Sequence, residues 1–287
     1  MTIEPRSGYF LSQRLRLHYT EWGDPDAPPL ILQHGGRDHG RSWDRVVQAL
    51  LPDWRIIAPD LRGHGDSGWA EDSNYGMDDC LYDHAMLFDQ LGLERATVIG
   101  HSLGGNIALR HAAARPERIV KLVVIEGLGP SPERLAEAAA LPVNKRMADW
   151  IAERTKALQR RARVYPTLDE AVARLHGVHP HLSADWARHL AVHGVRKVDG
   201  GYCFKADPCM TLLPLHEFSA EERRAMWRAI TVDTLLVYGA DSWASNPALD
   251  GRAAFFPHAR TAVIEGAGHW VHHDKLAEFV ALLRGFL

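Results

Sequence analysis

One short segment carries residues suited to nucleophilic chemistry. Gly100-His101-Ser102-Leu103-Gly104 stands between an apolar run and an alanine-rich stretch. A Gly-x-Ser-x-Gly pattern between a strand and a helix holds the serine on a sharp turn, so that its Oγ projects from the strand end. A helix that begins directly afterwards points backbone N–H groups at a nearby anion. The segment therefore predicts Ser102 as a nucleophile that forms a covalent intermediate.

The elements that must position this serine alternate along the chain. Residues 9–22 alternate apolar and polar side chains, which indicates an antiparallel hairpin. Later runs are continuously apolar and are separated by helix-like stretches, which is typical of a parallel sheet covered on both faces. These runs are PLILQ, WRIIAPD, ATVIG, IVKLVVIE, TLLVYG and ARTAVIE. The sequence predicts an α/β fold with a mostly parallel sheet, and ligands are expected beyond the carboxyl ends of its strands.

One connection is too long for an ordinary crossover. Roughly a hundred residues separate IVKLVVIE from TLLVYG, whereas connections in compact domains are usually a few residues long. Prolines punctuate this region between helical stretches such as RMADWIAERTKALQRRA and SADWARHLAVHG. We therefore expect an inserted α-helical cap above the carboxyl edge of the sheet.

From about residue 9 to its end, the sequence resembles the α/β-hydrolase family. Besides the segment around Ser102, three motifs stand in the family's order and spacing: Leu32-Gln33-His34-Gly35-Gly36, Asp60-Leu61-Arg62-Gly63-His64-Gly65-Asp66-Ser67 and Gly266-Ala267-Gly268-His269-Trp270. The resemblance implies a catalytic core of residues 1–128 and 231–287, with the cap at 129–230 between its two parts.

The resemblance also implies a base and an oxyanion hole. His269 follows the last predicted strand in a glycine-flanked loop, where the family carries the base that accepts the serine proton. Two preorganised N–H donors must also stabilise the oxyanion. The N–H of Leu103 is the first candidate, and the N–H of Gly36 is the second, with Gly35 as its alternative.

The other histidines near these motifs have different expected roles. We expect His34 and His64 to face the core and to bond to backbone groups beside the strand ends. The side chain of His101 should leave the turn in another direction than that of the serine. His272 and His273 are interpreted as structural or surface groups.

Two carboxylates compete for the role of orienting the imidazole. Most members of the family carry the acid three residues after the glycine that ends TLLVYG, and this sequence has Ser242 there, with Asp241 one residue earlier. An offset of one residue in an extended segment sends a side chain to the opposite face. Some members carry the acid after the preceding strand, where this sequence has Glu126. Burying an ionisable group at the end of an apolar run costs free energy unless the group is paired. We favour Glu126, and Asp241 remains the alternative.

The substrate is less clearly indicated. Arg37 and Trp43 continue the loop after Gly36 toward the expected mouth of the site, and Trp43, Trp243 and Trp270 would suit an apolar pocket if they line the interface with the cap. These four residues are therefore candidates for substrate binding, with packing in the loop or the core as the alternative. We expect hydrolysis of a carboxylic ester or lactone. Cleavage of a carbon–carbon bond in a vinylogous diketone uses the same residues and is the alternative. A non-catalytic hydrolase-fold receptor is a further alternative, although such proteins usually lack one of these residue types.

Composition excludes several classes of function. The net charge of −3 offers no general attraction for nucleic acid or anionic membranes. Three cysteines without paired spacing favour a reducing, cytoplasmic environment. We see no signal peptide and no membrane-spanning run. The sequence lacks a His-Glu-x-x-His motif and a phosphate-binding loop, so we expect neither a metal nor a cofactor. The expected partner is a small ester-like molecule.

Overall fold

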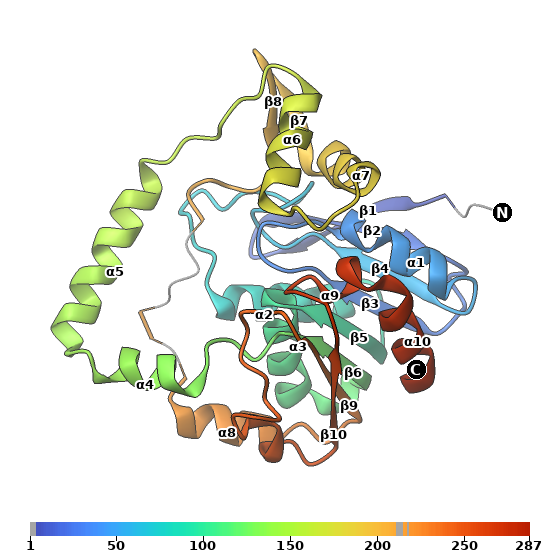
Figure 1. The fold of residues 1–287 in the computed structure, drawn as a ribbon, viewed down its shortest axis with the longest axis vertical. Coiled ribbons are helices and arrows are strands. Elements are labelled where there is room, and N and C mark those ends of the chain that lie inside the picture. The colour runs from blue at the N-terminus through green and yellow to red at the C-terminus, as the bar shows by residue number, and fades with distance from the viewer. Residues whose placement is uncertain (1–3, 211–214, 217) are drawn as a thin grey trace.

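The computed structural model describes residues 4–210, 215–216 and 218–287, which form an eight-stranded sheet between helices (Figure 1). In their order across the sheet, the strands are β1 (Arg6–Ser12), β2 (Leu15–Trp22), β4 (Arg55–Pro59), β3 (Pro29–Gln33), β5 (Ala96–His101), β6 (Ile119–Ile125), β9 (Thr234–Gly239) and β10 (Ala259–Ile264). β1 and β2 pair antiparallel, as do β2 and β4, and the other pairs are parallel. The predicted fold class and the opening hairpin are confirmed.

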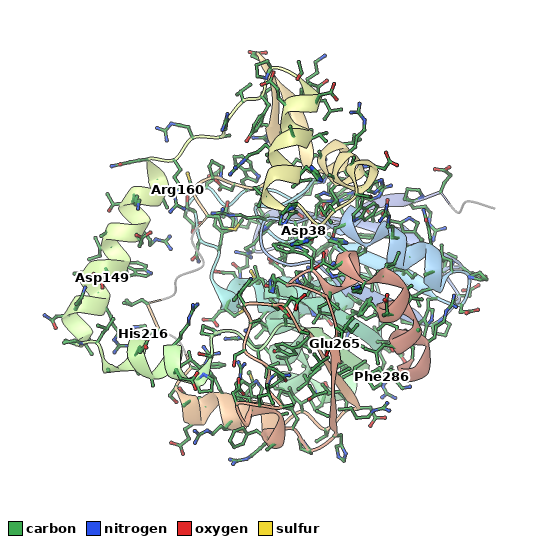
Figure 2. All side chains as sticks on the ribbon, viewed as in Figure 1. Asp38, Asp149, Arg160, His216, Glu265 and Phe286 are labelled. Atoms are coloured by element: carbon green, nitrogen blue, oxygen red, sulfur yellow. The ribbon has the colours of Figure 1, made fainter. Side chains whose placement is uncertain are left out.

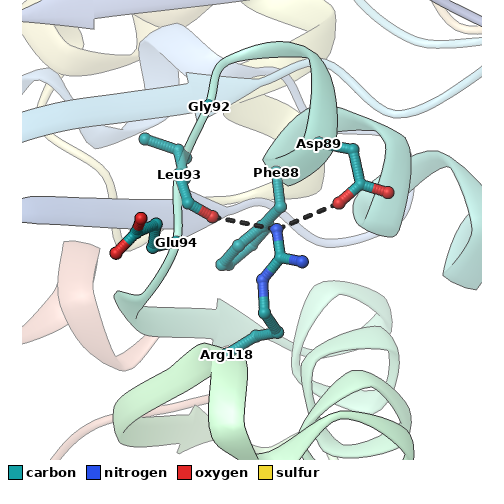
Figure 3. Close-up of a pocket in the computed structure, with 6 residues that line it drawn as sticks. All are labelled: Phe88, Asp89, Gly92, Leu93, Glu94 and Arg118. Atoms are coloured by element: carbon teal, nitrogen blue, oxygen red, sulfur yellow. Dashed lines mark hydrogen bonds and ion pairs between the residues drawn. The ribbon is translucent and has the colours of Figure 1, made fainter.

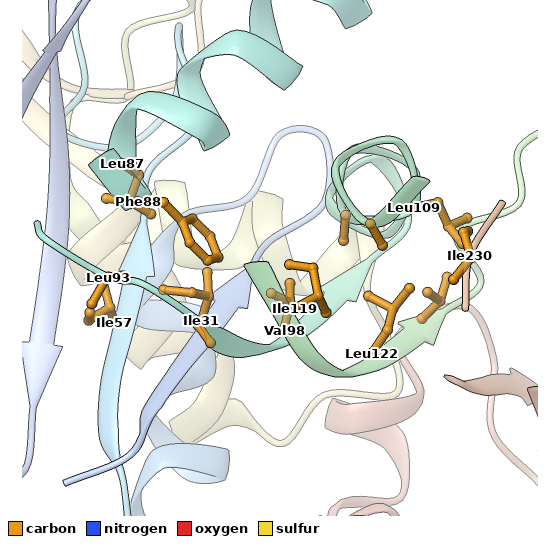
Figure 4. Packing of buried hydrophobic residues seen from close by; sticks show 14 of the residues in the cluster. Ile31, Ile57, Leu87, Phe88, Leu93, Val98, Leu109, Ile119, Leu122 and Ile230 are labelled. Carbon is orange, nitrogen blue, oxygen red and sulfur yellow. The ribbon is translucent and has the colours of Figure 1, made fainter. Parts of the chain in front are cut away.

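Helices cover both faces of the sheet. On one face lie α2 (Met77–Gln90), α3 (Leu103–Ala114) and α8 (Ala220–Arg228), and on the other lie α1 (Asp44–Leu50), α9 (Val271–Asp274) and α10 (Leu276–Phe286). Successive strand residues alternate between the two layers: Ile31 packs on the α2 side with Phe88, whereas Leu30 and Leu32 pack on the α1 side (Figure 4). Burial of each such side chain contributes about 1.5–3 kcal/mol. The continuous apolar runs therefore reflect strands buried on both faces.

The insertion between β6 and β9 contains helices and a small hairpin. Its further elements are α4 (Pro132–Ala140), α5 (Val143–Leu158), α6 (Leu168–Val178), α7 (Ala184–Gly194), β7 (Val195–Val198) and β8 (Gly201–Phe204). The hairpin differs from the purely helical cap that the sequence suggests. Its four-residue strands are joined by Asp199 and Gly200, and Gly200 has a φ of +84°, as a tight hairpin turn requires. Strands this short carry too little periodicity to be recognised in the sequence.

The parts of the insertion occupy different places. α6 and α7 lie above the carboxyl edge of the sheet, whereas α5 projects to one side of the body, with Asp149 on the helix and Arg160 just after its end (Figure 2). α8 packs under the sheet against α3, and Trp227 joins the hydrophobic core. The last helix of the insertion therefore lies with the core layer rather than with α6 and α7. Within the described ranges, no helix has the length and apolar character needed to cross a bilayer.

Candidate active site

Ser102 lies at the turn between β5 and α3. Its φ of 52° and ψ of −113° place it outside the regions that ordinary residues adopt, and it occupies the N-cap position of α3. The turn needs its glycines, since a Cβ at Gly104 would lie 2.4 Å from the carbonyl oxygen of Gln33. The N–H of Ser102 donates to the carbonyl of Ile125 at 2.8 Å. The neighbouring strand β6 thus anchors the backbone of the strained serine.

Glu126 follows β6 at the same edge of the sheet. It also has a positive φ, 51°, and its N–H donates to the carbonyl of Val237 on β9 at 3.0 Å. Its side chain is 0% exposed, and its Oε2 atom accepts a hydrogen bond from Nδ1 of His269. With Nδ1 donating to a carboxylate, the Nε2 atom of His269 keeps its lone pair for a proton. The structure therefore supplies an oriented base.

Further donors hold the carboxylate of Glu126. The N–H of Gly239 donates to Oε1 at 2.9 Å, and the hydroxyl of Ser242 donates to Oε2 at 2.6 Å. No motif around Ser242 indicates this role, because Ser242 only stands where most of the family carries an acid. Asp241 is exposed, and its N–H donates to the carbonyl of Ala267. The structure thus brings Glu126, and not Asp241, to the imidazole of His269.

His101 supports the loop that carries His269. Its Nε2 atom donates to the carbonyl oxygen of His269 at 2.9 Å, and the two rings are 4.8 Å apart. Burial holds the pKa of His101 well below its usual range, with the nearby His269 as a further cause, so the ring is neutral. Its side chain leaves the turn to brace the base, as the sequence analysis expects.

Of the three tryptophans that are candidates for substrate binding, two contact His269 and one is buried in the core. The ring of Trp243 lies 4.6 Å from that of His269 and is 73% exposed, and Trp270 contacts the same imidazole edge to face at 5.1 Å. Trp43 was expected in the same group, but it is 0% exposed and stacks on His272 at 4.4 Å. This prediction for Trp43 is wrong because the start of α1 turns its side chain into the core.

The loop after β3 lies directly against Ser102. A Cβ at Gly35 would be 3.2 Å from the Cβ of Ser102. Gly36 is half-buried beside it, and the N–H of the following Arg37 is occupied because it donates to His64 at 2.9 Å. The side chain of Arg37 is exposed, and its φ is 62°. Leu103 opens α3, where the first N–H groups of a helix have no partner within the helix. Leu103 directly follows Ser102, and Gly36 lies in the loop that packs against it, so both candidate oxyanion donors belong to segments beside the serine.

Two neutral histidines fix this loop. Nδ1 of His34 donates to the carbonyl of Gly35 at 2.7 Å, while its Nε2 accepts from the N–H of Leu61 at 2.9 Å. His64 donates from Nδ1 to the carbonyl of Arg62 at 2.9 Å and accepts from Arg37 through Nε2. Burial lowers the pKa of His34 to about 3 and that of His64 to about 4. Both rings are backbone braces, as the sequence analysis expects.

A hollow of about 500 Å³ lies elsewhere on the surface (Figure 3). Arg118 crosses it and donates to the carbonyl of Leu93 at 2.9 Å and to Asp89 at 3.0 Å. Leu93 precedes β5, and Arg118 precedes β6, so this hollow opens at the amino ends of the strands. Ser102 stands at the opposite edge, so the hollow is not part of the candidate active site.

Three groups of histidines and aspartates in the described part of the chain have spacings that suit a metal ion. In the group of His18, Asp60 and Asp66, the carboxylate of Asp60 already accepts from three donors, among them Nδ1 of His18. In the group of Asp44, His189 and His193, a bidentate bond from Arg41 occupies Asp44. The third group consists of Asp38, His272 and His273. Asp38 in the third group also accepts a hydrogen bond, from the N–H of His39 to Oδ1 at 2.8 Å, while its Oδ2 has no hydrogen-bond partner in the described part of the chain.

Comparison with known proteins identifies the family of this fold. The alpha/beta hydrolase fold family matches residues 28–199. A serine hydrolase-like protein of Danio rerio is 33% identical over 187 residues, which are 65% of this chain and 57% of that protein's length. Esterase Rv0045c of Mycobacterium tuberculosis is 28% identical over 274 residues, which are 93% of this chain and 84% of the esterase.

Solved structures extend the likeness over nearly the whole chain. A thioesterase domain from the curacin biosynthetic pathway has a TM-score of 0.85 at 24% identity and covers 98% of this chain and 99% of its own, which is a likeness of fold. A structure of Rv0045c, described together with its inhibition by transition metals, has a TM-score of 0.76 at 26% identity and covers 98% of this chain and 91% of its own. With its sheet topology, its serine turn and the matched residues taken together, the chain belongs to the alpha/beta hydrolase fold family.

Proposed function

We propose that this protein hydrolyses carboxylic esters, including lactones, through an acyl-enzyme on Ser102. The observation that carries the proposal is the hydrogen bond between Glu126 and His269 at the sheet edge where the strained Ser102 projects. A serine needs a base to accept its proton, and the base needs a carboxylate to orient it and to stabilise its protonated form.

The residues divide the reaction between them. The Oγ of Ser102 attacks the carbonyl carbon as its proton passes to Nε2 of His269, which Glu126 then stabilises as an imidazolium. The carbonyl oxygen becomes an oxyanion, which accepts hydrogen bonds from the N–H groups of Leu103 and Gly36. The alkoxide leaves as an alcohol with the proton from His269. A water molecule then attacks the acyl-enzyme by the same route and releases the acid.

The surroundings of His269 favour an apolar substrate group. Trp243 and Trp270 present aromatic surface on two sides of the imidazole. Aromatic side chains of this kind bind aliphatic or aromatic groups through buried apolar area. The relatives include an esterase and a lipase of M. tuberculosis, which supports this choice among serine-dependent reactions.

The test is hydrolysis of p-nitrophenyl esters from acetate to long acyl chains. We expect turnover by the native protein and none above background by Ser102→Ala, because no other group takes over the attack. Trp243→Ala should raise KM for longer chains more than it lowers kcat, since Trp243 would contact the substrate rather than the reacting atoms. Equal rates for native protein and Ser102→Ala, or no turnover of any ester, would contradict the proposal.

A further inference from the structure

A third polar cluster lies next to the loop of His269. Asp38 follows β3 beneath the cap helices, as Figure 2 shows, and His272 and His273 lie on α9. One ligand atom from each side chain lies within 4.8 Å of the other two. The cluster thus combines a residue of the loop after β3 with two residues that follow the catalytic histidine, so it forms only in the folded chain.

Four polar side-chain atoms of this cluster are buried without hydrogen-bond partners in the described part of the chain, whereas Oδ1 of Asp38 accepts from the N–H of His39 at 2.8 Å. His272 is 1% exposed, and neither of its ring nitrogens has a hydrogen-bond partner in the described part of the chain. The same is true of Oδ2 of Asp38 and Nε2 of His273. A neutral imidazole carries one donor and one acceptor, and leaving both unmet in the interior costs free energy that folded proteins avoid. A ligand that accepts lone pairs from nitrogen and oxygen would remove part of this cost, because it would engage one ring nitrogen of each histidine and Oδ2 of Asp38.

We propose that Asp38, His272 and His273 form a binding site for a divalent transition-metal ion such as Zn²⁺ or Co²⁺. Two imidazoles and one carboxylate are a ligand set that suits Zn²⁺ and its neighbours rather than Ca²⁺ or Mg²⁺, which prefer oxygen. At bond lengths of about 2.0–2.2 Å, tetrahedral ligand atoms lie roughly 3.3 Å apart, so small side-chain rotations close the site. Water would occupy the fourth position.

The electrostatic state of the ligands suits an ion. Burial lowers the pKa of His273 to about 3 and holds that of His272 well below its usual range, so both rings are neutral and need not lose a proton. Burial also raises the pKa of the Asp38 carboxyl, because a lone negative charge there is poorly solvated. A bound cation would compensate that charge.

Metal binding must compete with a contact from the cap. The indole N–H of Trp186 on α7 donates to Nδ1 of His273 at 3.2 Å. If Nε2 of His273 binds the ion, a neutral ring carries its proton on Nδ1, which then no longer accepts. If Nδ1 binds the ion, its lone pair is used. In both cases the hydrogen bond from Trp186 is lost, so the ion loosens a tie between the cap and the core.

The same site adjoins the base. The ring of His272 lies 4.9 Å from that of His101, and His101 donates to the carbonyl of His269. An ion that draws His272 toward Asp38 would shift this contact. Occupancy is therefore expected to slow ester hydrolysis, although the binding itself needs neither Ser102 nor the proposed reaction.

Calorimetric titration of Ser102→Ala with Zn²⁺ tests the site, with the visible absorption of bound Co²⁺ as a second measure. We expect one ion per chain. Affinity should fall at least about tenfold when either Asp38→Asn or His273→Ala is added, because each removes a ligand. Trp186→Phe should tighten binding by about fivefold, since one competing hydrogen bond of about 1 kcal/mol is gone. Circular dichroism and Tm show whether each variant is folded.

Two control variants test whether the ion binds at this cluster and not at a neighbouring histidine. His269→Ala removes the catalytic imidazole, and His193→Ala removes a ligand of the group around Asp44. Both should retain the affinity of the Ser102→Ala protein. Unchanged affinity in folded Asp38→Asn and His273→Ala, or a loss confined to either control, would overturn the proposal. So would the absence of binding at millimolar metal. The binding assay does not depend on catalysis, so these outcomes leave the ester hydrolase proposal to its own test.

Discussion

The hydroxyl of Ser242 donates to the same carboxylate oxygen of Glu126 that accepts from His269. Ser242 stands where most α/β-hydrolases are expected to carry their acid. The side chains of Glu126 and Ser242 therefore meet at the same place beside the imidazole, although they come from adjacent strands. Glu126 reaches it from the end of β6, and Ser242 reaches it from the loop after β9. We therefore expect that the carboxylate can be moved from position 126 to position 242 with part of the activity retained.

Replacing the carboxylate should remove most activity. In Glu126→Gln, the amide no longer stabilises the imidazolium and can hold the ring in the wrong tautomer, so we expect kcat to fall by about 10⁴. Asp241→Asn is the matched control and should change kcat less than twofold, because Asp241 is exposed and the imidazole already has its partner. Ester hydrolysis under saturating substrate measures both. A large loss in Asp241→Asn with little loss in Glu126→Gln would reverse the assignment.

Moving the acid to the neighbouring strand should restore part of the activity. Glu126→Ala vacates the space beside Nδ1 of His269, and Ser242→Asp places a carboxylate on the side chain that already reaches it. We expect the double variant to recover at least about tenfold in kcat over Glu126→Ala alone, as a charged acceptor is regained. Ser242→Asp in the presence of Glu126 should be impaired, because two carboxylates would share one site. If a folded double variant shows no recovery of kcat, a carboxylate at position 242 cannot replace that of Glu126.

Enlarging Gly35 should disturb the oxyanion loop. A Cβ there would lie 2.8 Å from Nδ1 of His101 and 3.2 Å from the Cβ of Ser102, so the loop must retreat. A displacement of about 1 Å costs about 10² in rate, and we expect Gly35→Ala to lower kcat by that order. Gly285→Ala is the control, since nothing lies within 4 Å of the added methyl group and an alanine favours helix α10. Unchanged kcat in Gly35→Ala would show that the loop tolerates the shift.

Local patterns in the sequence reveal the candidate nucleophile and the candidate base. Ser102 lies in a five-residue motif, and His269 lies in another, so adjacent residues identify each. Trp43 was misplaced because a loop tryptophan gives no local sign of whether it faces solvent or the core. The cluster of Asp38 and His272 joins residues far apart in the chain, which no spacing rule connects. The bond from Ser242 to Glu126 likewise depends on the pairing of β6 with β9.

Acid should destabilise the fold through its buried histidines. The pKa of His34 is about 3 and that of His64 about 4, below the ordinary value of 6.5. Between pH 6.5 and about 4 the unfolded chain binds more protons, so the free energy of unfolding falls as pH falls, and it is fully regained above pH 6.5. Each group contributes a slope of up to about 1.4 kcal/mol per pH unit.

Urea unfolding between about pH 7 and about pH 5 measures this slope. His64→Gln removes one of the titrating groups, so its stability should depend less steeply on pH even where it is lower overall. A slope equal to that of the native protein would mean that His64 is not buried in its neutral form.

The position of Glu126 at the end of β6 has a consequence for how the enzyme can diversify. The segment that follows β9 does not have to supply the acid in this arrangement, and its large exposed hydrophobic residues, Trp243 at 73% and Leu249 at 86%, do not pack in the core. Randomised libraries over residues 243–249 should therefore yield altered substrate ranges with catalysis retained. In relatives that carry the acid on this loop, the same mutations should change both the substrate range and the rate of catalysis.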